Sequence, residues 1–84
     1  MEHELKIEEP YAEAILSGDK TFEVRFNDRG YQKGDTIRFI AVSSFVGAAA
    51  IEGKLFLITY VLTHPLLSEG AVVLAIKEIK EHDQ

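Results

Sequence analysis

Residues 17–29 read S-G-D-K-T-F-E-V-R-F-N-D-R, and this stretch decides the fold that we expect for the chain. In a β-strand, successive side chains point to opposite faces of the sheet. A strand over residues 20–27 therefore carries two unlike rows. The apolar row is Phe22, Val24 and Phe26, and the polar row is Thr21, Glu23, Arg25 and Asn27. We predict that the apolar row seals the core and that the polar row lines a hollow, with Lys20 at the strand's entry.

The size and composition of the chain predict one small globular domain. At 84 residues there is room for a single core, so we expect residues 1–84 to form one domain. Hydrophobic residues make up 46% of the chain and charged residues 27%, which is typical of ordinary soluble proteins. The absence of cysteine excludes disulfides, thiolate metal sites and cysteine nucleophiles.

The ends of the chain and its apolar runs give no sign of a membrane protein. The N-terminal M-E-H-E-L-K is acidic and lacks the apolar core of a signal peptide. No apolar run approaches the ~20 residues that a helix needs to cross a bilayer. We therefore expect a cytoplasmic protein that does not contact membranes, and we expect it to be a monomer.

The charge is unevenly distributed along the chain. A net charge of −5 disfavours broad, nonspecific binding to phosphates. Residues 19–38, however, hold five basic and four acidic side chains, and all three arginines of the chain lie there. Arginine is suited to planar, bidentate recognition of phosphates, carboxylates and guanine edges. The segment is therefore either a recognition surface or a solvated sheet face with ion pairs.

The remaining sequence predicts a mainly β, α+β domain. We expect strands over residues 3–7, 36–42, 54–63 and 71–79, and a short helix from about residue 8 to Gly18. Residues 43–53 form a loop with a strand start or a half-turn of helix, and residues 80–84 form a polar tail. The predicted architecture is a β-pseudobarrel of five or six mostly antiparallel strands with one short helix after the first strand.

Several aromatic and aliphatic residues outside the central strand are also expected in the core. The segment over residues 54–63 is apolar on both faces, which is typical of a buried strand. The helix stripe is expected to comprise Tyr11, Ala14, Ile15 and Leu16, and the strands are expected to bury Phe39, Phe56, Leu57 and Tyr60.

Common catalytic and cofactor-binding motifs are missing. The sequence contains no phosphate-binding loop, no dinucleotide fingerprint and no nucleophile elbow. The three histidines lack the spacing of paired metal ligands, so we expect neither a metal site nor a cofactor.

The remaining chemistry lies in the central strand. Glu23 and Arg25 are two residues apart and share one face, and the long side chain of Lys20 can reach the carboxylate. The carboxylate can accept a hydrogen bond from an exocyclic amine while Arg25 binds a carbonyl or phosphate. The alternative is a surface salt-bridge cluster worth up to about 1 kcal/mol per pair.

These residues carry a resemblance to a known family. The run G-D-K-T-F-E-V-R at residues 18–25 resembles the G-x-K-x-x-E-x-R signature of ASCH domains, in the PUA-like superfamily. The opening H-E-L-K-I, the segment P-Y-A-E-A-I-L-S, a G-D-x-I turn and a final G-x-V-V-L-A-I-K resemble one small, mostly uncharacterised branch found in bacteria and phages. The resemblance implies a β-pseudobarrel whose cleft recognises RNA or modified nucleosides. It assigns the signature roles to Lys20, Glu23 and Arg25, and Asn27, Asp28 and Arg29 match the branch.

A related group with enzymatic activity differs at one key position. Those proteins are amidohydrolases acting on acetylated cytidine, with a lysine and a nucleophilic threonine in the signature. Lys20 matches the lysine, but the position of the threonine is Glu23 here. Thr21 lies two residues away, which is too far for it to replace that nucleophile. The resemblance therefore favours a protein that is not an enzyme, although Glu23 as a general base stays open.

Three hypotheses follow. The first is binding of single-stranded RNA or a nucleotide-like molecule, with Tyr31 or Tyr11 as the stacking face. The second is a small amidohydrolase acting on a modified nucleoside. The third is a domain that binds another protein through an edge strand or the apolar residues 45–50. The expected ligand-binding residues are Lys20, Thr21, Glu23, Arg25, Asn27, Asp28, Arg29 and Tyr31.

Overall fold

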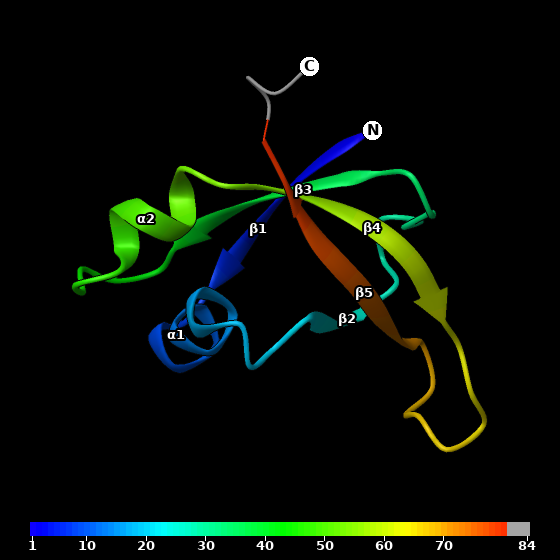
Figure 1. The fold of residues 1–84 in the computed structure, drawn as a ribbon. Coiled ribbons are helices and arrows are strands. Elements are labelled where there is room, and N and C mark those ends of the chain that lie inside the picture. Colours follow the sequence, from blue (N-terminus) through cyan, green and yellow to red (C-terminus); the bar gives the residue numbers. More distant parts are fainter. Residues whose placement is uncertain (81–84) are drawn as a thin grey trace.

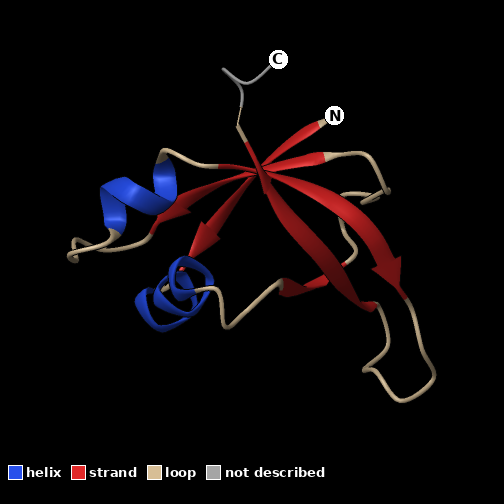
Figure 2. Cartoon of the chain, viewed as in Figure 1, coloured by secondary structure: helices blue, strands red, loops and turns tan. Residues whose placement is uncertain are grey.

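The computed structural model describes residues 1–80, so residues 81–84 of the expected polar tail lie outside the described residues. Figures 1 and 2 show a mainly β domain with two short helices on one side of a strongly curled sheet. In chain order the elements are β1 (Glu2–Ile7), α1 (Glu9–Ser17), β2 (Phe22–Phe26), β3 (Thr36–Ala41), α2 (Ala48–Glu52), β4 (Leu55–Leu62) and β5 (Ala71–Ile79). The predicted mainly β, α+β fold is confirmed, and the curled five-stranded sheet is consistent with the expected β-pseudobarrel.

The five strands form one sheet in the order β1-β3-β4-β5-β2. β1 pairs with β3 in parallel, and the other three pairs are antiparallel, which confirms the mostly antiparallel sheet. β2 lies at the far edge beside β5, so it pairs with neither β1 before it nor β3 after it in the chain. Both edge strands, β1 and β2, come from the first third of the chain.

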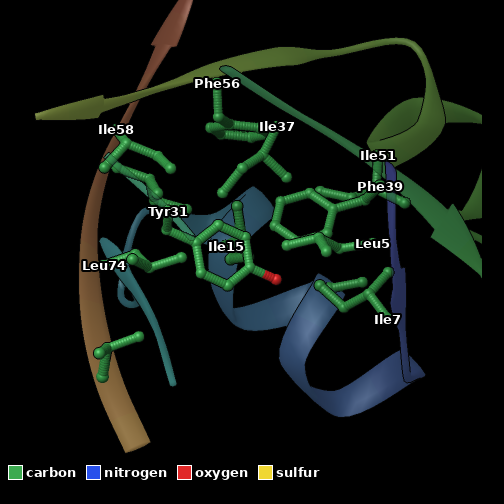
Figure 3. Close-up of a cluster of buried hydrophobic side chains, with 13 residues drawn as sticks. Leu5, Ile7, Ile15, Tyr31, Ile37, Phe39, Ile51, Phe56, Ile58 and Leu74 are labelled. Atoms are coloured by element: carbon green, nitrogen blue, oxygen red, sulfur yellow. The ribbon is translucent and has the colours of Figure 1, made fainter. Parts of the chain in front are cut away.

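The core lies inside the curl of the sheet, under α1 and α2 (Figure 3). Phe39 of β3 and Phe56 of β4 are buried as predicted, and their rings meet edge to face with centroids 5.5 Å apart. Each strand except β2 sends alternate aliphatic side chains inward. The core members labelled in Figure 3 are Leu5, Ile7, Ile15, Tyr31, Ile37, Phe39, Ile51, Phe56, Ile58 and Leu74.

α1 begins and ends where the sequence predicts. Pro10 occupies the first turn, where its missing N–H costs nothing, and Glu9 lies at the positive end of the helix dipole. Gly18 ends the helix with φ of 88°, and its N–H donates to Ile15 O. The buried residues of α1 are Ala12 and Ile15, whereas Tyr11 is exposed, which corrects the expected stripe.

Residues 48–52 form α2, so the expectation of a single helix is incomplete. α2 packs between β3 and α1 and buries Ile51. A side chain at Gly47 would place its Cβ 2.9 Å from Leu16 Cδ1, so glycine there permits the close approach to α1. Val46, beside it, is fully exposed, and Phe45 packs against the core.

β4 contains a bulge that changes which side chains face the core. Its register with β5 shifts between Ile58 and Tyr60, leaving Thr59 unpaired. Ile58 points inward, and after the extra residue Val61 lies on the inner face while Tyr60 points outward. The expected burial of Tyr60 is therefore wrong, and Leu57 is only half-buried.

β2 faces the opposite way from the prediction. Phe22, Val24 and Phe26 are all exposed, and Glu23 is buried. The ladder pairs Glu23 with Leu74, whose side chain lies in the core. Alternation shows only that the two rows lie on opposite faces, whereas the neighbouring strand decides which row points inward.

A buried histidine ties β1 to the loop before β3. His3 Nε2 donates to Asp35 Oδ2 at 2.9 Å, and the same oxygen accepts from the backbone N–H of Gln32 at 3.1 Å. The His3 ring also contacts Tyr31 edge to face, with centroids 4.8 Å apart. The hydrogen bond from His3, opposed by partial burial, holds the pKa of Asp35 below its ordinary value of 3.8.

We expect Asp35→Asn to lower the free energy of unfolding by about 1–2 kcal/mol near neutral pH. The pKa of this carboxyl group is lower in the folded than in the unfolded protein. Its contribution to the stability of the fold is therefore complete when the pH is above the unfolded-state pKa, and it is lost as the pH falls through the folded-state pKa. The difference between Asp35→Asn and wild type should therefore shrink below about pH 3.8. Urea unfolding across this range measures it, and a difference that stays constant with pH would contradict the assignment.

Candidate functional site

The two edge strands of the curled sheet are joined by side chains rather than by a ladder. Arg25 Nη2 donates to Lys6 O at 2.6 Å, and Arg29 Nη1 donates to Glu4 O at 2.9 Å. Both acceptors are backbone carbonyls of β1, and both donors come from β2 and the turn after it. We call this junction between β1 and β2 the seam. The arginines satisfy part of the exposed edge of β1, which has β3 as its partner on the other side.

The buried carboxylate of Glu23 binds two cationic side chains at the seam. Glu23 Oε1 accepts from Lys20 Nζ, and Glu23 Oε2 accepts from Arg25 Nε at 3.0 Å. Lys20 Nζ also donates to Phe22 O at 2.6 Å. The cluster is well shielded from solvent, so each contact is stronger than an exposed ion pair, and removing one partner leaves the others uncompensated.

A cleft of about 660 Å³ opens along the seam. Such a volume falls within the range of small-molecule sites, roughly 300–1,000 Å³. One wall is formed by the end of β1 and the start of α1, and the other by β2. Its lining residues are Lys6, Ile7, Glu8, Tyr11, Lys20 and the whole of β2 (Phe22–Phe26).

Aromatic rings and cations lie together in this cleft. Tyr11, Phe22 and Phe26 are 53%, 42% and 67% exposed, respectively. Lys20 Nζ lies 5.8 Å from the ring centroid of Tyr11 and 5.2 Å from that of Phe22. The lining holds three cations and two acids in a chain whose net charge is −5, so the cleft is locally positive. This combination can accept a flat, electron-rich ring together with an anionic group.

The structure brings together the three signature residues, Lys20, Glu23 and Arg25, as the sequence predicts. Their shared hollow exists, but Glu23 lies within its wall rather than at its surface. Thr21 is exposed and lines a different depression, with Lys54 and Ile76.

The other expected ligand-binding residues lie in or after the turn that follows β2. Asn27 Oδ1 accepts from the backbone N–H of Tyr31 at 2.9 Å, and Arg29 belongs to the seam. Asp28 is exposed in the turn and does not line the cleft. Tyr31 is buried in the core, where burial raises the pKa of its phenol above 10.0. Its ring therefore offers no stacking face.

Sequence reasoning missed Lys6, Phe22 and Phe26 as cleft residues. The two phenylalanines were assigned to the core because alternation in β2 is equally compatible with either orientation. Lys6 reaches the site only because β1 and β2 meet across the seam, a contact between strands that are not paired. The exposure of Tyr11 could have been predicted from the local sequence, because Tyr11 follows Pro10 in the first turn of a short helix.

The carboxylate of Glu23 is fully engaged within the cluster. Each oxygen of Glu23 already accepts a hydrogen bond from a cation, which makes Glu23 a poor general base. Within residues 1–80, no three His, Cys, Asp or Glu side chains are grouped so that they could hold a metal ion. Over the same residues, neither helix has the length and apolarity required to span a membrane.

Comparison with known proteins gives a family and a fold. Residues 2–76 match the model of a family described as "Domain of unknown function (DUF3850)". The chain is also similar to a solved structure titled "Crystal structure of hypothetical protein PH0355", with a TM-score of 0.62 and 18% sequence identity. That match covers 94% of this chain and 100% of the other. At this identity the likeness concerns the fold. No curated protein shows a significant match to the chain.

We expect Glu23→Gln to lower the free energy of unfolding by about 1–3 kcal/mol, because Lys20 and Arg25 would lose their shared anionic partner. Urea denaturation measures the change. Glu13→Gln is the matched control, since Glu13 is exposed in α1. Equal stabilities of the two variants would show that the buried cluster does not hold the seam.

Proposed function

Since the chain belongs to the family described as a domain of unknown function (DUF3850), its role has to be inferred from the site, and we propose that it binds a nucleotide or a short single-stranded RNA in the seam cleft. The observation that carries this proposal is the exposed pair of rings, Tyr11 and Phe22, with the Lys20 ammonium between 5 and 6 Å from both. Bases of single-stranded nucleic acids stack on such rings, and cations beside them contact the phosphates.

Each group in the cleft has a role in this proposal. A base stacks on Tyr11 or Phe22. Lys6 and Lys20 contact the phosphate. An ammonium group has three donors, and Lys20 uses two of them in the contacts described above, so one is left for the phosphate. Arg25 uses Nε and Nη2 within residues 1–80, which leaves Nη1 for a carbonyl or phosphate of the ligand.

The charge of the protein sets the strength of this interaction. Outside the cleft the chain is strongly acidic, which opposes the approach of a long polyanion. The proposal therefore favours a ligand of one or a few nucleotides. With few phosphate contacts, the binding constant should depend only weakly on salt. The slope of its logarithm against the logarithm of salt concentration is about −0.7 for each phosphate contact with a single strand.

The resemblance to ASCH domains supports the same class of ligand. In the PUA-like superfamily the corresponding cleft is associated with RNA or modified nucleosides, and Lys20, Glu23 and Arg25 stand at the signature positions. We assign the chain to the ASCH branch as part of this proposal. The role of Glu23 differs from the sequence-based expectation, since here it positions Lys20 and Arg25 instead of meeting the base.

The test is an NMR titration of the ¹⁵N-labelled protein with nucleoside monophosphates and short single-stranded RNAs. We expect shift changes at Tyr11 and over residues 20–26. Tyr11→Ala should weaken binding by about 1–3 kcal/mol, the value of one base–aromatic contact. Lys6→Gln should weaken binding and reduce the salt slope by about 0.7.

Matched controls separate the cleft from the general surface. Tyr60→Ala removes a tyrosine of similar exposure that does not line the cleft, and Lys33→Gln removes an exposed lysine away from it. Both controls should bind as wild type does. Absence of shift changes at millimolar ligand, or equal losses in Tyr11→Ala and Tyr60→Ala, would refute the proposal.

A further inference from the structure

The outward side of β2, β5 and β4 carries a continuous apolar surface. Residues paired across neighbouring strands point to the same face of a sheet. The ladder pairs each outward residue of β2 with an outward residue of β5, and two of these with residues of β4. We call this surface the outer apolar face, and it comprises Phe22, Val24, Phe26, Ala71, Val73, Ala75, Tyr60 and Leu62.

This face is large for a protein of this size. None of its eight residues is buried, and five of them are exposed, namely Phe22, Val24, Phe26, Tyr60 and Leu62. Together they expose on the order of 500 Å² of side-chain surface, near the upper end of what monomeric proteins show. Both helices lie away from the β4–β5 hairpin in Figure 1. Within residues 1–80, nothing covers this face.

The charges around the face indicate what covers it. The face has no charged member, although the chain carries a net charge of −5. Lys77, two residues beyond Ala75, is exposed on the same side of β5 at one end of the face. Asp28 and Glu69 are exposed beyond the opposite end. The face contains no acidic residue that could bind a basic partner. A second copy of the chain would instead bring a matching apolar face, with a positive charge at one end and negative charges at the other.

We propose that two copies of this chain pack through the outer apolar face. A two-fold axis lying in the interface and running across the strands sets the Lys77 end of each copy against the end of the other that carries Asp28 and Glu69. Val24 and Val73 then lie near the axis. Sheets pack face to face in this manner in β-sandwiches. The two faces together bury on the order of 1,000 Å², which suits a weak, concentration-dependent dimer.

The proposal goes beyond the ligand cleft and revises the expectation of a monomer. The sequence-based prediction placed the phenylalanines of β2 in the core, whereas they face outward. Phe22, Val24 and Phe26 belong to both surfaces. Tyr11 and Lys6, however, belong only to the cleft, and Tyr60 and Leu62 only to the face. Variants can therefore separate ligand binding from self-association.

Sedimentation velocity from micromolar to millimolar concentrations tests the dimer. We expect the wild type to sediment as a monomer when dilute and increasingly as a dimer when concentrated. Val24→Lys places a charge at the centre of the face and should raise the dimer dissociation constant at least about tenfold. Tyr60→Lys should do the same from β4, at a position outside the cleft.

Val42→Lys is the matched control, because Val42 is 52% exposed against 55% for Val24 and lies at the end of β3, outside the face. It should dimerise as wild type does. Circular dichroism and thermal unfolding confirm that each variant is folded. A wild type that stays monomeric at millimolar concentration overturns the proposal, as does dimerisation that Val24→Lys and Val42→Lys affect equally.

Discussion

The contact between Glu23 and its two cations stabilises the orientation of β2 that its pairing with β5 sets. With Glu23 on the inner face, Arg25 follows on the same face and reaches the backbone of β1. The seam closes the curl of the sheet, and the cleft opens along it. Because side chains alternate along a strand, Phe22 and Phe26 point outward when Glu23 points inward. One buried carboxylate is thus connected to the closure, the cleft and the exposed aromatic surface.

Much of this architecture was predictable from local sequence signals. The caps of α1, the turns before β3 and the positions of all five strands follow from proline, glycine and alternation, and the convergence of Lys20, Glu23 and Arg25 follows from their spacing. The facing of β2 was not predictable, because it depends on pairing with β5 nearly fifty residues away. The contribution of Lys6 to the cleft depends likewise on the meeting of two strands that share no ladder.

In the function that we propose, the seam serves stability and recognition with the same groups. Lys20 and Arg25 use some of their donors for Glu23 and for backbone carbonyls, and both side chains line the cleft. Side chains fixed in this way lose little conformational entropy when a ligand arrives. By the same coupling, the proposed ligand would stabilise the fold, since it would add contacts across the junction that holds the edges together.

The unpaired residue in β4 has a consequence for how related chains can diverge. If β4 kept Thr59 but paired it with Ala75, without the bulge, alternation would turn Tyr60 and Leu62 toward the interior and Val61 toward solvent. The exterior of the distal hairpin is thus controlled by the pairing register as well as by residue identity. Homologues that pair the same β4 residues without a bulge would present a different surface there with unchanged composition.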